Sequence, residues 1–210
     1  MLETLCGHDS KRGKRREAIL GAAHLLFVEK GYESTTLNDI VRRSGGSLAT
    51  LYDMFENKPG LLRALVTERC MTIDGALDSA IATGAPFDQA LRAIAEDMLD
   101  RFLDPNFVGL FRVMIAQCIS HPDLGRQTYD AGPVVCQAKA ADFFARQMAA
   151  GALADGDPMT VSKTFFQMIC GDFQSQLMFG LPVGLDESQR AAHLDHVLPL
   201  FTKAFAPTPR

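Results

Sequence analysis

Hydrophobic positions recur along almost the whole chain at intervals of three and four residues. From Arg15 onward they form one apolar stripe that Gly31 ends, made of Ile19, Ala22, Ala23, Leu26 and Phe27. This spacing puts the apolar side chains on one face of a helix. The two-residue alternation of a strand is hard to find anywhere in the sequence. The pattern therefore predicts an all-α fold.

Two short helices follow the first, and each has a recognisable start. Thr36 and Asp39 delimit a capping box, in which a hydroxyl and a carboxylate bind the unpaired amides of a helix start. The residues Leu37, Ile40 and Val41 are expected to point inward from this helix, and Leu51 and Phe55 from the next. Gly45 and Gly46 separate the two because glycine adopts a positive φ without steric cost, and Ser47 is a good N-cap. Three short helices, two of them joined by a tight glycine turn, predict a helix-turn-helix module.

The helix after Ser47 begins without a charged residue. A tight joint fixes the angle between two helices, so that the first braces on the DNA backbone and the second enters the major groove. Ala49 lets the backbone approach closely, and Thr50 can donate or accept at a base edge or a phosphate. Tyr52 offers a hydroxyl to a phosphate, and Lys58 lies at the next helix start, where a cation and free amides favour an anion. A helical hairpin within an ordinary bundle is the alternative.

Composition and charge set this module in context. The chain has 210 residues, of which 47% are hydrophobic and 22% charged, which fits one or two globular domains. Up to Arg69 it has eleven basic and nine acidic residues; of the totals of 21 and 25, ten basic and sixteen acidic residues remain. The N-terminal part is therefore the one suited to a polyanion. Its basic run KRGKRR at 11–16 is either a DNA contact or a solvated tail.

The first residues are polar and basic with no apolar run behind them, so we expect no secretory signal. No apolar run reaches the roughly eighteen residues needed to cross a bilayer. We therefore expect a cytoplasmic protein without a membrane partner. Its five cysteines, at positions 6, 70, 118, 136 and 170, are scattered and form no CxxC pair, which indicates reduced thiols that mainly fill the core.

Residues 15–62 resemble the DNA-binding domain of the TetR family of bacterial repressors. The resemblance is carried by RREAILGAAHLLFVEKGYESTT, by LNDIVRRSGG and by SLATLYDMFENKPGLL. Three positions depart from the family pattern. Gly46 replaces a branched apolar turn residue and is expected to loosen the turn, Met54 replaces a frequent His and removes a phosphate donor, and Leu48 replaces a common Lys and leaves an apolar contact, for example with a thymine methyl. The residues and the resemblance together predict DNA contacts by Thr36, Arg43, Ser47, Leu48, Ala49, Thr50, Tyr52 and Lys58.

Seven further helical stretches follow, bounded by Gly and Pro signals such as Asp104-Pro105 and Gly132-Pro133. They are expected at about 59–82, 87–103, 106–120, 122–131, 133–150, 158–180 and 187–205, and Pro199 should kink or shorten the last. The order RVMIAQCISHPDLGRQTYDAGP, followed by a helix, GAL and a helix started by DP, resembles the AefR-type regulatory domain of the same family. The predicted organisation is a basic, flexible arm at 1–14, a helix-turn-helix DNA-binding domain at 15–60, and a larger helical ligand-binding and dimerisation domain at 61–210.

Two of these stretches have little polar surface. Their apolar residues are Ala140, Ala141, Phe144 and Met148 in 133–150, and Phe165, Phe166, Ile169, Phe173, Leu177 and Met178 in 158–180. A helix that is apolar over most of its circumference must be covered on more than one side. The resemblance implies that these two helices form a four-helix homodimer interface. Burial wholly within one subunit is the alternative.

A regulatory domain of this kind needs a cavity for an effector among its central helices. The candidate ligand contacts are Phe102, Phe107, Phe111, Met114, Cys118, Tyr129 and Gln174, most of which could equally be filled core. Methionine and phenylalanine predominate among them, which favours a small apolar or aromatic effector over a polyanion.

Enzymatic interpretations are weak. His193 and His196 flank Asp195 on a helix, but no further metal ligand is evident nearby, and GDPMTVSK at 156–163 lacks the glycine spacing of a phosphate loop. We predict no catalytic residue, no metal and no cofactor. The resulting hypothesis is a homodimeric transcriptional regulator, a repressor that a small molecule releases from its operator DNA. The alternative is a helical ligand-binding protein, or a redox sensor that uses Cys118, Cys136 or Cys170, without DNA binding.

Overall fold

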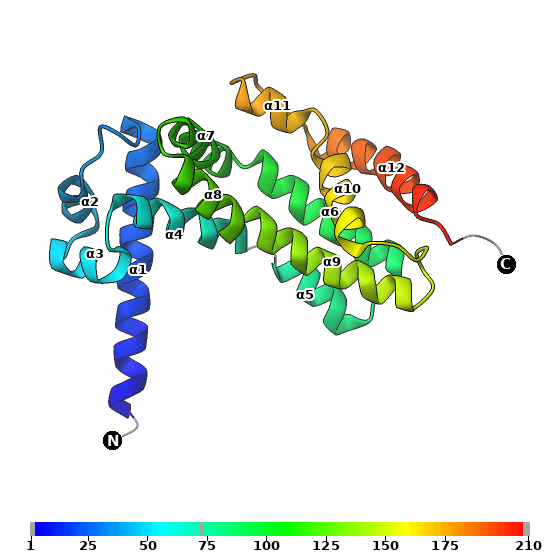
Figure 1. Cartoon of the computed structure of the whole chain (residues 1–210), viewed down its shortest axis with the longest axis horizontal. Coiled ribbons are helices and arrows are strands. Elements are labelled where there is room, and N and C mark those ends of the chain that lie inside the picture. The colour runs from blue at the N-terminus through cyan, green and yellow to red at the C-terminus, as the bar shows by residue number, and fades with distance from the viewer. Residues whose placement is uncertain (1–2, 72–73, 208–210) are drawn as a thin grey trace. The chain divides into compact units, whose positions relative to one another are not determined.

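The computed structural model describes residues 3–71 and 74–207, and every regular element in these ranges is an α-helix (Figure 1). The all-α prediction is confirmed. The helices are α1 Glu3–Lys30, α2 Leu37–Ser44, α3 Leu48–Phe55, α4 Lys58–Met71, α5 Asp74–Thr83, α6 Phe87–Leu103, α7 Pro105–Ser120, α8 Pro122–Ala131, α9 Pro133–Ala149, α10 Pro158–Cys170, α11 Phe173–Met178 and α12 Glu187–Ala204.

Contacts between residues divide the chain into two compact units. The first, which we call the N-terminal unit, comprises Met1–Arg69 and Gly109–Ala131; the second, the core unit, comprises Cys70–Val108 and Gly132–Arg210. Gly109–Ala131 therefore groups with the first helices, although the sequence assigned it to the C-terminal domain. Glycine allows this packing, because a Cβ at Gly109 would lie 3.2 Å from both γ-methyl groups of Val28 on α1.

In the N-terminal unit, α1 begins at Glu3 rather than at Arg15, so residues 11–14 are helical and not a flexible arm. Lysine and arginine are good helix formers, and a glycine such as Gly13 costs only about 1 kcal/mol in a helix. The predicted apolar stripe is confirmed, since each of its five residues is buried. Gly31 follows the last helical residue with a φ of 84°.

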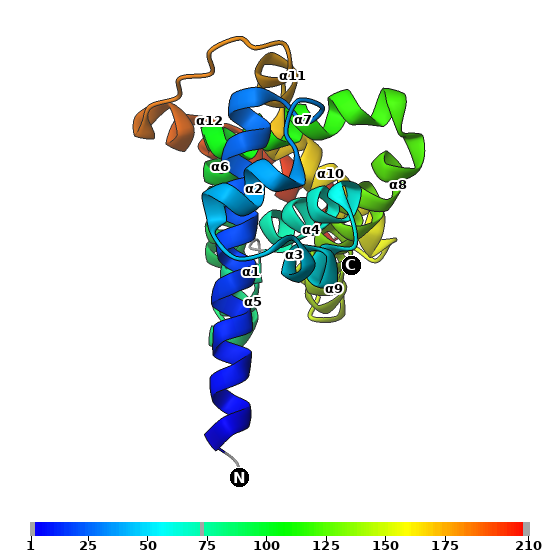
Figure 2. The same ribbon diagram turned by 90° about the vertical axis from the view of Figure 1, so that its left-hand side faces the viewer.

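The predicted capping box and glycine turn are both present in α2 and α3. The Thr36 hydroxyl accepts from the Asp39 amide at 3.1 Å, and the Asp39 carboxylate accepts from the Thr36 amide at 3.1 Å. Gly45 and Gly46 adopt φ values of 76° and 80° between the two helices. Figure 2 shows α2 in front of α1 in this unit. Ile40, Leu51 and Phe55 point inward as predicted and are buried; Leu37 and Val41 are half-buried.

The core unit is built around packed phenylalanine rings. The centroid of the Phe144 ring lies 5.5 Å from that of Phe165 and 5.6 Å from that of Phe201, and the last two are 5.2 Å apart. All three side chains are almost fully buried. Residues from α6, α9, α10 and α12 complete this core. Burial of such large apolar side chains is the main force that holds these helices together.

The C-terminal helices differ from expectation at Gly171, and at Pro199 in one of its two predicted effects. The stretch 158–180 is not one helix, because α10 ends at Cys170 and Gly171 adopts a φ of 49° before α11 begins. Pro199 does not shorten the last helix, which continues to Ala204, and a kink at Pro199 stays a prediction. Pro199 and Asp195 are both exposed, so water can satisfy the carbonyl that loses its amide donor.

Within the described residues, no single helix is long and apolar enough to cross a membrane. Only α6 and α7 taken together, with a sharp bend between them, reach that length and composition.

Candidate nucleic-acid interface

Helix α3 has one buried and one exposed face. Leu51 and Phe55 are 0% and 4% exposed and anchor the helix to its unit. On the other face, Ala49 is exposed and the Tyr52 side chain is 51% exposed, while Leu48 and Thr50 are half-buried. The short helix therefore presents a small residue and a phenol to solvent, close to its N-terminus.

Hydroxyl groups organise the start of α3. The Ser47 hydroxyl accepts from the Thr50 amide at 3.2 Å, as expected of an N-cap, and lies 2.9 Å from the Thr50 hydroxyl. The two predicted contact residues therefore form one hydrogen-bonded pair. Each hydroxyl can still interact with a further group at this exposed end, because a hydroxyl has one proton and two lone pairs.

Two other predicted DNA contacts, Thr36 and Arg43, are occupied within the chain. The Thr36 hydroxyl donates to the Asp39 carboxylate at 2.8 Å in the capping box. Arg43 donates to both carboxylate oxygens of Glu29, at 2.7 Å and 3.2 Å, and this hydrogen bonding lowers the pKa of Glu29. Both side chains are exposed at this surface. The Thr36 hydroxyl would have to give up its bond to Asp39 to donate to a phosphate, whereas Arg43 has further N–H donors beside those bound to Glu29.

Lys58 opens α4, as predicted, but its side chain turns toward α1 and its following loop. Its Nζ lies 4.3 Å from the centre of the Tyr32 ring and donates to the Glu33 carbonyl at 3.2 Å. Burial lowers the pKa of Lys58 and raises the pKa of Tyr32 to about 12. The amide at the start of α4 that the sequence left for an anion is bound instead by Asn57, whose Oδ1 accepts from Gly60 N at 2.7 Å.

Three arginines of the basic run bind other parts of the unit, which the sequence did not predict. Arg12 forms an ion pair with Asp53 on α3 at 3.3 Å. Arg15 donates to the Ser44 carbonyl at the end of α2 at 2.7 Å, and Arg16 pairs with Glu68 on α4 and lies over the Phe55 ring. The signal was their i, i+3 and i+4 spacing, which puts them on one face once the helix is known to start before residue 11. Lys11 and Lys14 are exposed and have no described partner.

Comparison with known protein families agrees with this geometry. A model described as bacterial regulatory proteins, tetR family, matches residues 19–65, and one described as AefR-like transcriptional repressor, C-terminal domain, matches residues 89–207. The second match alone covers more than half of the chain. The chain belongs to the TetR family. This is a family of DNA-binding transcriptional regulators, and the predicted AefR-type subgroup is confirmed.

Individual relatives of this TetR-family protein include both repressors and an activator. It is 47% identical over 51 residues to the HTH-type transcriptional repressor ComR of Escherichia coli (strain K12), and 27% identical over 121 residues to the HTH-type transcriptional activator FasR of Mycolicibacterium smegmatis. These matches cover 24% and 58% of this chain, and only 24% and 55% of the length of the relatives. Among solved structures, the flavonoid-responsive regulator FrrA superposes with a TM-score of 0.73 at 27% identity, covering 94% of this chain and all of its own.

The predicted effector contacts of the TetR-family chain fall into both units. Phe111, Met114, Cys118 and Tyr129 belong to the N-terminal unit, whereas Phe102, Phe107 and Gln174 belong to the core unit. Met114 is buried, Tyr129 is half exposed, and the others are half-buried. The Phe102 and Phe107 rings meet edge to face at 5.7 Å. Neither unit contains all seven residues.

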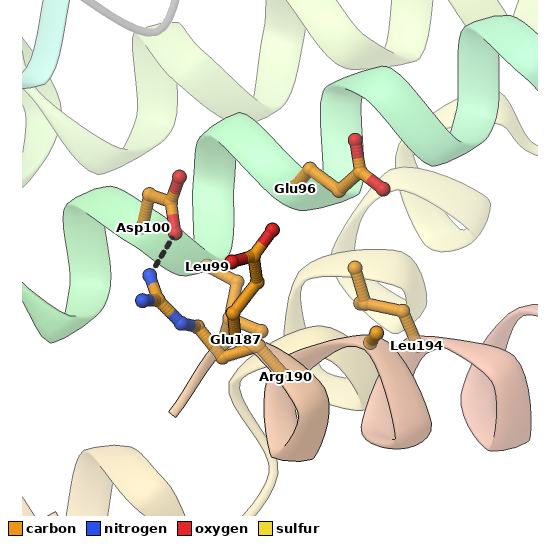
Figure 3. Close-up of a pocket in the computed structure, with 7 residues that line it drawn as sticks. Glu96, Leu99, Asp100, Glu187, Arg190 and Leu194 are labelled. Carbon is orange, nitrogen blue, oxygen red and sulfur yellow. Dashed lines mark hydrogen bonds and ion pairs between the residues drawn. The ribbon is translucent and has the colours of Figure 1, made fainter. Parts of the chain in front are cut away.

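The core unit has an open pocket of about 370 Å³ between α6 and α12 (Figure 3). Buried Leu99 and Leu194 contribute its apolar wall, and Arg190 on α12 pairs with Asp100 on α6. None of the predicted effector contacts lines this pocket. A second, apolar pocket lined by Met98, Phe166 and their neighbours has a volume of only about 10 Å³, enough for no more than a water-sized group.

The thiol and metal alternatives find little support in the side chains involved. Cys136 and Cys170 are 4% and 5% exposed, and burial raises the pKa of Cys170 to about 12, which disfavours the reactive thiolate. His193 hydrogen-bonds to the Ile169 carbonyl at 3.0 Å and packs against Phe173. These contacts are typical of core residues.

Proposed function

We propose that this TetR-family chain binds operator DNA by inserting α3 into the major groove. The supporting observation is the joint at Gly45 and Gly46, which lets α3 start directly after α2 while its exposed face stays uncovered. A helix held on one face and free on the other, close to its N-terminus, suits groove binding. Double-stranded DNA is the ligand that this arrangement fits best.

The proposed contacts divide into two roles. Leu48, Ala49 and Thr50 face base edges, because they lie in the first turn of α3 and bring no charge that would have to be desolvated. Ser47, Tyr52 and the exposed side of α2, with Thr36 and Arg43, contact phosphates. Lys58 contributes a positive charge behind them, with its own position fixed by Tyr32 and Glu33.

We propose further that the protein is a repressor that a small apolar or aromatic molecule releases from DNA. The AefR-like repressor model and ComR favour repression, whereas FasR is named an activator. The name of FrrA, a flavonoid-responsive regulator, favours a flat aromatic effector. The contacts proposed for it are Phe102, Phe107 and Gln174 within the core unit, and Phe111, Met114, Cys118 and Tyr129 within the N-terminal unit.

The active form is proposed to be a homodimer that pairs through α9, α10 and α11. The residues first assigned to this interface need revision, because Ala140, Ala141, Phe144, Met148, Phe165 and Ile169 are all buried within the chain. The half-buried Phe166, Phe173, Leu177 and Met178 remain, and next to them Phe179 is 84% exposed. An exposed phenylalanine beside half-buried apolar residues is typical of a surface that a partner covers.

Selection of DNA by the full-length chain tests this function. Double-stranded fragments with a randomised centre would be enriched on the protein and sequenced. We expect one sequence with two related half-sites whose centres lie about 34 Å apart or a multiple of this, as a symmetric dimer requires. No enrichment over the starting pool would overturn the proposal. A panel of flavonoids added to the selected complex would then test effector release.

A further inference from the structure

We propose that Arg15 is a positioning residue that fixes the joint between α2 and α3 from inside the unit, and that it does not contact DNA. The inference rests on the proposed function, because it concerns how the DNA-reading helix is held. It divides the basic run at 11–16 into arginines that bind the protein itself and lysines that face solvent.

The guanidinium of Arg15 lies against the glycine turn. Its Nη1 donates to the Ser44 carbonyl at 2.7 Å, and its Nη2 donates to the Ser44 hydroxyl at 3.1 Å and to the Gly45 carbonyl. These acceptors lie at the C-terminus of α2, where helical carbonyls have no amide partner. A cation at this end also interacts favourably with the helix dipole.

Arg15 also fills the space that a side chain at Gly46 would need. A Cβ on Gly46 would lie 2.5 Å from Nη2 and 2.6 Å from Cζ of Arg15, closer than such atoms can approach. A Cβ on Gly45 would lie 3.7 Å from Nη1, an ordinary contact. The sequence suggested that Gly46 loosens the turn, since a branched apolar residue is usual there. In the structure, the arginine of α1 takes the place of that side chain.

Neighbouring cations show the same division. Arg12 and Arg16 have carboxylate partners on α3 and α4, whereas Lys11 and Lys14 have no described partner and are exposed. Lys14 is therefore the matched control for Arg15, one residue away in the same helix. A phosphate contact and an internal contact give different salt dependence, because only the former releases counterions.

The first experiment compares Arg15→Lys, Arg15→Ala and Lys14→Ala in the full-length chain. Affinity for the selected operator and for unrelated DNA would be measured over a series of salt concentrations. We expect both Arg15 variants to lose about tenfold or more of the ratio between specific and non-specific affinity, with an unchanged salt slope. Lys14→Ala should keep the ratio and lower the slope by about one. An Arg15→Lys variant with the wild-type ratio, or an Arg15→Ala variant with a reduced slope, would overturn the inference.

The second experiment uses the two glycines as a matched pair. Gly45→Ala and Gly46→Ala both place alanine at a positive φ, which strains the backbone at either position. Only a Cβ at Gly46 displaces the Arg15 guanidinium. The loss of specificity caused by Gly46→Ala should therefore be smaller in the Arg15→Ala background than in the wild-type background, whereas the loss caused by Gly45→Ala should be the same in both. An effect of Gly46→Ala that is equal in the two backgrounds would contradict the proposed contact.

Hydrogen exchange separates this inference from the proposed function. If the wild-type chain selects no DNA, the proposed function fails, but the effect of Arg15 on the joint can still be measured. We expect Arg15→Lys to increase amide exchange in α3 while α9 and α10 keep wild-type protection. Unchanged exchange in α3 would overturn the positioning role whether or not the protein binds DNA.

Discussion

In the core unit, Phe144, Phe165 and Phe201 are 1%, 0% and 0% exposed and pack ring against ring, whereas α2 in the N-terminal unit has Ile40 as its buried residue. Burial of apolar side chains holds the long helices of the core unit together. The eight-residue helices α2 and α3 are too short to be stable alone, and beside their few buried side chains they depend on caps, a glycine turn and arginine contacts. A helix held by specific polar contacts has a well-defined direction while one face stays free, which a DNA-reading helix needs.

The largest expected effect lies in the core unit. Phe144→Ala removes a ring that contacts Phe143, Phe165 and Phe201. Because the cavity can close only in part, we expect a loss of about 3–5 kcal/mol in the free energy of unfolding. Urea unfolding followed by hydrogen exchange would locate this loss in α9 and α10. A loss below about 1 kcal/mol would mean that the packing of this ring contributes little to the stability of the core unit.

A smaller loss is expected from the caps of the N-terminal unit. Thr36→Ala removes the hydroxyl that binds the Asp39 amide, and should destabilise α2 by about 1 kcal/mol. Ser34→Ala changes an exposed hydroxyl without a described partner and should stay within about 0.5 kcal/mol of wild type. Amide exchange in α2 measures both variants. Equal exchange in the two would argue that the capping box does not hold α2.

These local features explain which parts of the fold were predictable. The capping box at Thr36, the cap at Ser47 and the glycine turn are encoded by neighbouring residues, so the sequence predicted them correctly. The sequence did not predict that α1 starts at Glu3. It also missed the contacts of Arg12, Arg15 and Arg16, because their partners lie on other helices far along the chain. The break at Gly171 was missed because apolar residues continue on both sides of it. The burial of Phe144 within one chain could not be distinguished from a dimer interface by periodicity alone.

A gain in stability is expected at the connection between α3 and α4. Glu56 adopts φ 64° and ψ −50°, and Asn57 N donates to the Phe55 carbonyl at 2.7 Å, which makes a strained three-residue turn. Glycine takes this conformation without steric cost, so Glu56→Gly should stabilise the N-terminal unit by about 1 kcal/mol. Thermal unfolding detects the change. A lower melting temperature would show that the turn carries little strain or that glycine's added freedom in the unfolded chain outweighs it.

The smallest expected effect is a change of stability at acidic pH. Hydrogen bonds from Thr36 lower the pKa of Asp39 below its ordinary value of 3.8. A carboxyl whose pKa is lower in the folded state stabilises the fold above pH 3.8, and this contribution is lost as the pH falls through the folded-state value. The difference in stability between wild type and Asp39→Asn should therefore shrink in urea titrations from pH 5 to pH 2. A constant difference would assign the effect of Asp39 to something other than its charge.

The central claim is that the exposed face of α3 reads DNA, and Ala49→Glu tests it most directly. Ala49 is exposed and lies in the first turn of α3, so a glutamate there should leave the free energy of unfolding within about 0.5 kcal/mol of wild type. Ala93→Glu, at an exposed position on α6, is the matched control. We predict that Ala49→Glu lowers affinity for the selected operator by about a hundredfold or more, because the carboxylate faces bases and phosphates, and that Ala93→Glu binds as wild type does. Equal operator affinity for the two variants would contradict the account.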